Sequence, residues 1–248
     1  MDKINILIKQ PKHNALKNHR GKIVVICGPM FAGKSEELLR QLKRLEYCQV
    51  PYIIFKPAID SRTNDLAKSR DGRVQKAIVI NHSSNVKEHL KKIKIFPFVV
   101  AFDEAQFLDS GIIEIVKDLA ALKITVLISG LDTDFNHRPF GPMGELLAIA
   151  DTVKKLTAIC ISCGSDATRT YRIPKPEMTQ EQILIGDSES YQALCSNCFN
   201  KQKSKTNFQK ELLKNIKVAK NNFFTNKNDL KPKLITTKKD PKQQKKVV

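Results

Sequence analysis

Between residues 21 and 157 the chain alternates short apolar runs with segments of helical periodicity. Runs rich in β-branched residues predict strands at residues 22–27, 52–55, 77–80, 98–102 and 124–128. Apolar residues at spacings of three and four predict helices at residues 35–46 and 110–122. Nearly continuous apolar strands separated by helices are typical of a parallel sheet covered on both faces. The pattern therefore predicts an α/β domain over residues 21–157.

The pattern changes after residue 157. Residues 158–206 carry two cysteine pairs, short β-like pieces at 169–173 and 183–185, and turn residues, so we expect a second, small domain there. Residues 207–248 are rich in Lys, Asn and Gln and offer little to bury, which predicts a mostly disordered tail. A helix at the start of this tail is compatible with the spacing of Phe208, Leu212, Ile216 and Ala219.

The net charge of +18 over 248 residues is concentrated at the two ends of the chain. Residues 1–20, a basic extension, carry +4, and residues 201–248 carry +12, whereas residues 21–200 are nearly neutral at +2. A Lys-rich tail attracts nucleic acid or acidic surfaces through non-specific, salt-dependent contacts. The charge therefore says little about what the folded part does.

No apolar run approaches the roughly 20 residues of a membrane span. The first residues are also too polar for a secretory signal. We therefore expect a cytoplasmic protein without a membrane partner.

Residues 28–35, Gly-Pro-Met-Phe-Ala-Gly-Lys-Ser, fit the pattern G-x-x-x-x-G-K-[ST] between a predicted strand and a predicted helix. In such a loop, glycines let successive backbone N–H groups face a phosphate, and the helix N-terminus adds a positive dipole. Lys34 would bridge the β- and γ-phosphates of ATP, and the Ser35 hydroxyl would bind Mg²⁺. The sequence therefore predicts an ATP site formed by Gly28, Pro29, Met30, Phe31, Ala32, Gly33, Lys34 and Ser35.

Two acidic residues, Asp103 and Glu104, directly follow the predicted strand 98–102. Because ligands bind beyond the carboxyl ends of parallel strands, we expect this pair and the following Ala105 and Gln106 to lie near the phosphate loop. Asp103 is placed to hold Mg²⁺, directly or through water, and Glu104 is then the candidate general base. An ordinary acidic strand end or helix N-cap is the alternative. The phosphate loop favours the first interpretation, since the two parts complete one reaction centre.

Two C-x-x-C pairs are separated by 31 residues: Cys160, Cys163, Cys195 and Cys198. Four thiolates at this spacing suit a tetrahedral, structural Zn²⁺ site with no open position for chemistry. Disulfides are the alternative, but nothing in the sequence indicates an oxidising compartment. Cys27 and Cys48 stand alone, and we expect both to be free and buried.

These features fit two classes of enzyme, a small-molecule kinase and a nucleic-acid-dependent ATPase. Residues 103–106, Asp-Glu-Ala-Gln, are similar to helicase boxes, and the tail is basic. Helicases need two such domains, however, and residues 21–157 make only one. A zinc-ribbon binding module is a third interpretation, but it leaves the phosphate loop unexplained.

The chain resembles the cytosolic, zinc-containing (type II) thymidine kinase family over about residues 21–199. The resemblance is carried by both cysteine pairs and by residues 28–35, 102–107, 130–135 and 138–141. It implies a P-loop parallel sheet with a small zinc-binding lasso, and transfer of the ATP γ-phosphoryl group to the 5′-hydroxyl of thymidine and deoxyuridine. It further implies a role in pyrimidine deoxynucleotide salvage for DNA synthesis, a homotetramer, and feedback inhibition by dTTP.

The resemblance also assigns roles to individual residues. Glu104 falls on the catalytic base, and Lys34 and Ser35 fall on the phosphate and Mg²⁺ contacts. The stretch that lines the ATP phosphates corresponds to Asp60, Ser61 and Arg62, with Arg62 as the catalytic charge stabiliser. The thymine site corresponds to Met30, Phe107, Leu131, Phe135 and Phe140, with Thr170 and Tyr191 beside the lasso residues Gln182, Ile183, Leu184, Ile185 and Gly186. Without the resemblance, the aromatic residues would be interpreted as core.

One prediction follows from the uneven charge. Deleting residues 210–248 should leave catalysis intact and abolish salt-sensitive retention on nucleic acid, because these residues carry half of the excess positive charge in one Lys-rich segment. Turnover and elution from immobilised DNA at increasing salt measure the two properties. Loss of thymidine phosphorylation in the truncated protein would show that the folded region extends beyond residue 210.

Overall fold

The computed structural model describes residues 21–60, 66–68, 72, 74–93, 97–174, 189–203, 212–213 and 215–217. The chain divides into two compact units, residues 1–202 and 203–248. All named helices and strands belong to the first unit. In the second unit, residues 212–213 and 215–217 are helical, at the place where the apolar spacing is compatible with a helix.

The first unit is built on a six-stranded sheet of order β5-β2-β6-β7-β1-β8 in which every pair is parallel. The strands are β1 (Ile23–Cys27), β2 (Tyr52–Pro57), β5 (Ile78–Ile80), β6 (Val99–Phe102), β7 (Thr125–Gly130) and β8 (Thr152–Lys155). The first five confirm the predicted strands. Because all strands run in the same direction, their carboxyl ends meet at one edge of the sheet.

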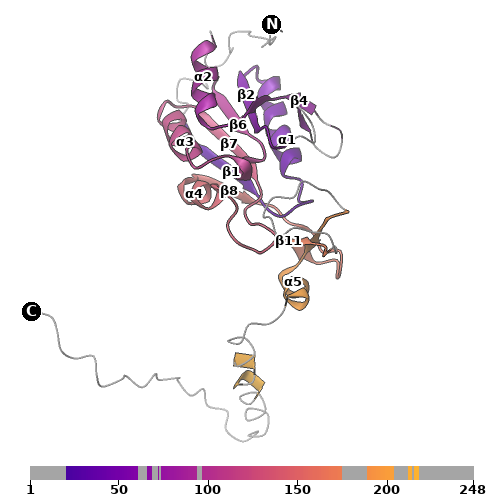
Figure 1. Ribbon diagram of the computed structural model, residues 1–248. Helices are drawn as coiled ribbons and strands as arrows, with labels where there is room; N and C mark the ends of the chain where they lie inside the picture. Colours follow the sequence, from indigo (N-terminus) through magenta and orange to yellow (C-terminus); the bar gives the residue numbers. More distant parts are fainter. Residues whose placement is uncertain are drawn as a thin grey trace, which may run out of the picture. The chain divides into compact units, whose positions relative to one another are not determined.

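Helices cover both faces of the sheet (Figure 1). Helix α1 (Lys34–Tyr47) packs Leu38, Leu39 and Leu42 against one face. The other face is covered by α2 (Ser84–Lys92), α3 (Ile112–Ala121) and α4 (Met143–Ile149). Helices α1 and α3 confirm the two predicted helices, and the layers confirm the α/β class.

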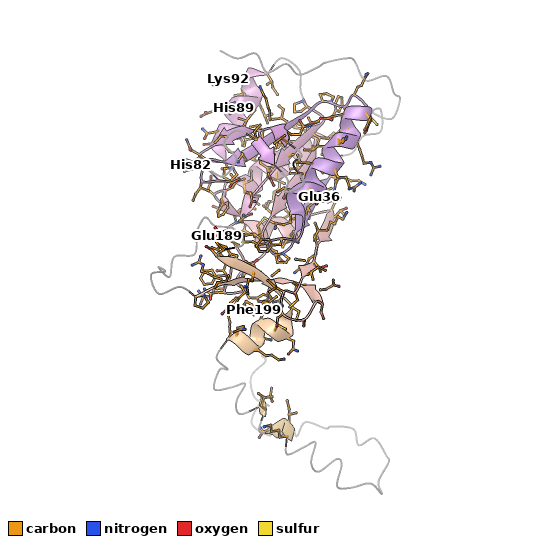
Figure 2. The ribbon with its side chains drawn as sticks, turned by 90° about the vertical axis from the view of Figure 1, so that its right-hand side faces the viewer. Glu36, His82, His89, Lys92, Glu189 and Phe199 are labelled. Carbon is orange, nitrogen blue, oxygen red and sulfur yellow. The ribbon has the colours of Figure 1, made fainter. Side chains whose placement is uncertain are left out.

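A small module follows the sheet domain. It contains two antiparallel pairs, β9 (Ala158–Ile159) with β10 (Asp166–Ala167) and β11 (Arg169–Arg172) with β12 (Tyr191–Leu194), followed by α5 (Ser196–Gln202). Its core is small and contains Phe199 of α5, seen in Figure 2, and the buried Cys160 and Cys198. Strand β11 confirms the predicted piece at 169–173, whereas 183–185 lies outside the described residues.

Two further elements flank the sheet: an antiparallel pair of β3 (Leu66–Lys68) with β4 (Val74–Lys76), and a short 3₁₀ helix, η3 (Ala105–Phe107). Cys27 is buried as expected, but the expectation for Cys48 was wrong, because its side chain is exposed. Helix α1 ends one residue earlier, and the chain turns away from the core through Gln49, whose φ is 54°. Among the described residues, no helix is both long and apolar enough to cross a membrane.

Candidate active site

The phosphate-binding sequence forms the loop between β1 and α1. Gly28 (φ 144°) and Gly33 (φ 75°) adopt backbone conformations that residues with a side chain rarely take. A Cβ atom on Gly28 would also lie 2.4 Å from the carbonyl oxygen of Leu156. Helix α1 begins immediately afterwards at Lys34, so its N-terminus faces the loop. The loop therefore has the backbone that phosphate binding needs.

The two polar residues at the end of the loop are held in place by short contacts. The buried Lys34 ammonium donates a hydrogen bond to the carbonyl oxygen of Pro29 at 2.8 Å. The Ser35 hydroxyl donates to Oδ1 of Asp103 at 3.2 Å. The structure thus brings the loop and the carboxyl end of β6 together.

Asp103 lies directly after β6 and is buried. The pKa of its carboxyl is raised to about 6, because burial and the nearby charges of Glu104 and Asp60 raise it more than hydrogen bonds from Ser129 and Ser35 lower it. Ser129 is on the neighbouring strand β7. A carboxylate next to a hydroxyl is a donor set of hard oxygen atoms, which is what Mg²⁺ requires. The residues present therefore fit this ion.

Glu104 is oriented by Gln106. The Gln106 amide donates to Oε2 of Glu104 at 2.5 Å, and its side-chain oxygen accepts the Leu131 N–H at 2.9 Å. Gln106 is buried, and a Cβ atom on Gly141 would lie 2.1 Å from its backbone carbonyl oxygen. Glu104 itself has a left-handed backbone, with φ 53°. Strained backbone of this kind is concentrated at functional sites.

The predicted thymine-site aromatics lie on η3 and on the segment after β7. Phe107 and the buried Phe140 pack edge to face, with ring centroids 5.5 Å apart. The segment from Leu131 to Phe140 folds back on itself, because the Asp134 side chain accepts the N–H groups of Asn136 and Arg138. Gln106 bonds to both Leu131 and Glu104, so the start of this segment lies beside Glu104.

The hairpin of β11 and β12 contacts both parts of the site. The Thr170 hydroxyl accepts the Met30 N–H of the phosphate loop at 3.0 Å. The Arg172 guanidinium lies 3.8 Å from the ring centroid of Phe135 and donates to the Tyr191 hydroxyl at 3.0 Å. The structure therefore gathers Met30, Phe135, Thr170 and Tyr191 around one hairpin.

Some residues of the site were missed by sequence reasoning. Arg172 shares a buried face with Thr170, since the two alternate along β11, and this alternation was the signal that could have found it. Ser129 gave no comparable local signal. Asp60 is buried, whereas Ser61, Arg62 and the lasso residues 182–186 lie outside the described part of the chain.

The four paired cysteines form one cluster, with all sulfur atoms within 4.8 Å of one another. All four are free thiols, and the 3.6 Å between the sulfurs of Cys163 and Cys195 is far longer than a disulfide bond. Hydrogen bonds from Ser165 lower the pKa of Cys163 to about 6, which favours its thiolate. The cluster could hold a metal ion.

The cysteine module braces the phosphate loop. Phe31 and Ala32 of the loop pack against its core, which includes Cys160 and Cys198. Together with the bond between Met30 and Thr170, this packing fixes the tip of the loop. The conformation of the phosphate loop therefore depends on the folding of the cysteine module.

The parallel sheet, the glycine loop before α1 and the acidic residue after β6 define a P-loop nucleotide-binding protein. Comparison with protein families matches residues 21–199 to the family described as thymidine kinase. The chain belongs to the thymidine kinase family.

Individual relatives agree. A thymidine kinase of Mycoplasma genitalium is 46% identical over 183 residues, which are 73% of this chain and 84% of the relative. A thymidine kinase of Mycoplasmoides gallisepticum is 42% identical over 86% of this chain and 95% of its own length. One from Bacteroides thetaiotaomicron is 42% identical over 73% of this chain and 87% of its own length.

The raised pKa of Asp103 predicts a cost in stability. A folded-state pKa of about 6 against 3.8 means that the folded protein loses stability as the pH rises from about 4 to above 6. Asp103→Asn should therefore raise the unfolding free energy of the ligand-free protein at pH 7.5 by about 1–3 kcal/mol.

Urea unfolding at pH 7.5 and pH 4.5 measures this effect, and the gain should shrink at the lower pH. Asp118→Asn, which removes an exposed carboxylate, is the matched control and should change little at either pH. A ligand-free Asp103→Asn protein no more stable than wild type at pH 7.5 would contradict the prediction.

Proposed function

We propose that this protein transfers the γ-phosphoryl group of ATP to the 5′-hydroxyl of thymidine, and also accepts deoxyuridine. The proposal is carried by the contact between Ser35 and Asp103, which joins the phosphate loop to the acidic strand end in a chain of the thymidine kinase family. Phosphoryl transfer needs positioning and charge stabilisation more than covalent chemistry. Each described residue near this contact supports one of these needs.

ATP is held by the backbone N–H groups of residues 28–33 and by Lys34. The Lys34 ammonium would exchange its bond with the Pro29 carbonyl for the phosphate oxygens. Asp60, Ser61 and Arg62 complete the phosphate site in this proposal, and Arg62 stabilises the charge that spreads over the transferred group. Asp60 is the member of this set that the structure describes.

Glu104 acts as the general base. Its carboxylate takes the proton of the thymidine 5′-hydroxyl as the oxygen attacks the γ-phosphorus, and the bond between the γ-phosphorus and the β,γ-bridging oxygen breaks to release ADP. Gln106 donates to one carboxylate oxygen, Oε2, and so holds the carboxylate in one orientation. The buried bridge from Leu131 through Gln106 thus aims the base at a fixed position.

Ser35 and Asp103 would hold Mg²⁺, which neutralises charge on the phosphate oxygens when it is bound. Thymine would lie in an apolar slot lined by Met30, Phe107, Leu131, Phe135 and Phe140. Thr170, Tyr191 and residues 182–186 would supply the polar edge that gives the slot its specificity. Ala105 and Gln106, which directly follow Glu104 in η3, complete the ATP-binding side of the site in this proposal.

Zn²⁺ is the ion we propose for the cysteine cluster. Four thiolate sulfurs are a soft, tetrahedral donor set, which suits zinc and leaves no open position. The role is structural, because the small module has few apolar residues to hold its strands together. Family membership further supports a homotetramer, inhibition by dTTP, a cytoplasmic location and a role in nucleotide salvage.

The proposed reaction is tested by product formation. Purified protein with Mg·ATP should form ADP and thymidine monophosphate in equal amounts, and only when thymidine is present. Parallel reactions contain single-stranded DNA, RNA, or no acceptor. ADP release stimulated by nucleic acid without a nucleoside product would overturn the proposal in favour of a nucleic-acid-dependent ATPase.

Glu104→Gln tests the base. We expect turnover to fall by at least about 10²-fold while ATP binding is kept, since the amide cannot accept the proton but preserves the shape of the side chain. Steady-state kinetics and calorimetric ATP titration measure the two effects. A variant within a few-fold of wild-type turnover would remove Glu104 from this role.

Metal removal tests the cysteine cluster. Wild-type protein should contain about one zinc per chain, and Cys163→Ser should lose the metal and melt at a lower temperature, since metal binding is coupled to folding. Metal analysis and thermal unfolding provide the readouts. Cys48→Ser, which changes an exposed lone cysteine, is the control and should keep metal content and melting temperature. Full zinc content in Cys163→Ser would reject the ligand assignment.

A further inference from the structure

Lys56 is a buried lysine at the carboxyl end of β2, with only 1% of its surface exposed. Its ammonium lies 3.0 Å from Oδ2 of Asp60, which is itself buried. The same ammonium donates to the carbonyl oxygen of Leu66 at 3.3 Å. One charged group therefore ties together two residues that flank positions 61–65.

A lysine is an expensive choice for this position. Taking an ammonium out of water costs several kcal/mol of desolvation free energy. The attraction of a buried carboxylate often does no more than offset that cost. The preceding residues of the strand, Ile53, Ile54 and Phe55, are apolar and buried. An apolar residue at position 56 would satisfy packing, so the charge points to a requirement other than stability.

The pair lies beside the carboxylate that we assign to Mg²⁺. Strand β2 pairs with β6, and the Asp103 N–H donates to the carbonyl oxygen of Phe55 at 3.0 Å. Lys56 is the next residue in the chain. Asp60 is also close enough to Asp103 for its negative charge to act on that carboxyl. Lys56, Asp60 and Asp103 thus lie near one another at the carboxyl ends of β2 and β6.

We propose that Lys56 is a positioning residue for the magnesium nucleotide: it holds the Asp60 carboxylate in place near Asp103, and so sets the affinity for Mg·ATP. Lys56 does not contact the substrate in this proposal, but acts through Asp60. The proposal rests on the ATP site of the proposed function. It differs from a purely structural role, in which the pair would only stabilise the connection between β2 and β3.

The test is a double-mutant cycle of Lys56→Met, Asp60→Asn and the double variant, since coupled residues give non-additive effects. Calorimetric titration with Mg·ATP gives Kd, and steady-state kinetics give KM for ATP and for thymidine. We expect Lys56→Met to raise Kd and KM for Mg·ATP by about 10–100-fold, the range seen when a residue that supports a metal ligand is removed. KM for thymidine should stay within about twofold, because the thymine slot is untouched.

The double variant separates positioning from stability. It leaves no unpaired buried charge, so it should recover the melting temperature that Lys56→Met loses, and it should bind Mg·ATP no more weakly than Asp60→Asn alone. Wild-type affinity in Lys56→Met or in the double variant would overturn the proposal, as would additive losses. If Lys56→Met does not fold, the comparison of the double variant with Asp60→Asn decides.

Two controls complete the experiment. Lys87→Met removes an exposed lysine that also lies 3.0 Å from a carboxylate, Asp118, and should leave every parameter unchanged. The binding titration does not depend on the acceptor. A wild-type protein that binds Mg·ATP but does not phosphorylate thymidine would therefore refute the proposed function while leaving the role of Lys56 testable.

Discussion

The parallel pairing of β2, β6, β7 and β1 is the constraint on which the site depends. In this register Phe55 lies opposite Phe102, Phe102 opposite Ile128, and Cys27 opposite Gly130. The chain therefore leaves four neighbouring strands at the same edge of the sheet. The bond between Ser35 and Asp103 joins residues 68 positions apart, and the ladder makes that contact possible. No single loop could assemble the same group of side chains.

Several charged side chains are buried at this edge of the sheet, although burial favours neutral groups. Asp103, Lys56 and Asp60 are all buried, and Asp132, also buried, is paired with Lys155 at 2.8 Å across the ends of β7 and β8. Each of these groups costs desolvation free energy that only partners can offset. The apolar layers on both faces of the sheet supply the stability that this arrangement needs. The buried charges of the site thus lower the stability of the fold.

The cysteine module supports the site by packing against the phosphate loop and Phe135. Its core is small, yet it packs against Phe31 and Ala32 and accepts a hydrogen bond from Met30 through Thr170. Its hairpin also carries Arg172, which covers the ring of Phe135. A metal that orders the cysteines would therefore order both the tip of the phosphate loop and the ring of Phe135, which we assign to the thymine site.

Local patterns of the sequence determined the elements whose signal is local. The glycine loop, the five apolar strands, α1 and the two cysteine pairs are each encoded within a few residues, so they could be predicted. Strand β8 could not, because its four residues are exposed and only backbone pairing with β1 makes them a strand. Helix α2 buries only Val86 and Leu90, which is too weak a period to detect. The expectation that Cys48 is buried was wrong because it lies at the end of α1, beyond the residues that the helix packs on the sheet.

For the candidate site, the sequence by itself determined the chemistry of the groups: a phosphate loop, a carboxylate pair and four thiols. Only the tertiary structure decided how they are supported. Ser129 and Arg172 contact partners on other strands or distant in the chain, and the pairing of Lys56 with Asp60 matters because the fold buries both residues. Their residue types alone do not reveal this. Strand order and register are long-range properties, set by which apolar faces can be buried together, and they therefore determine which polar side chains meet.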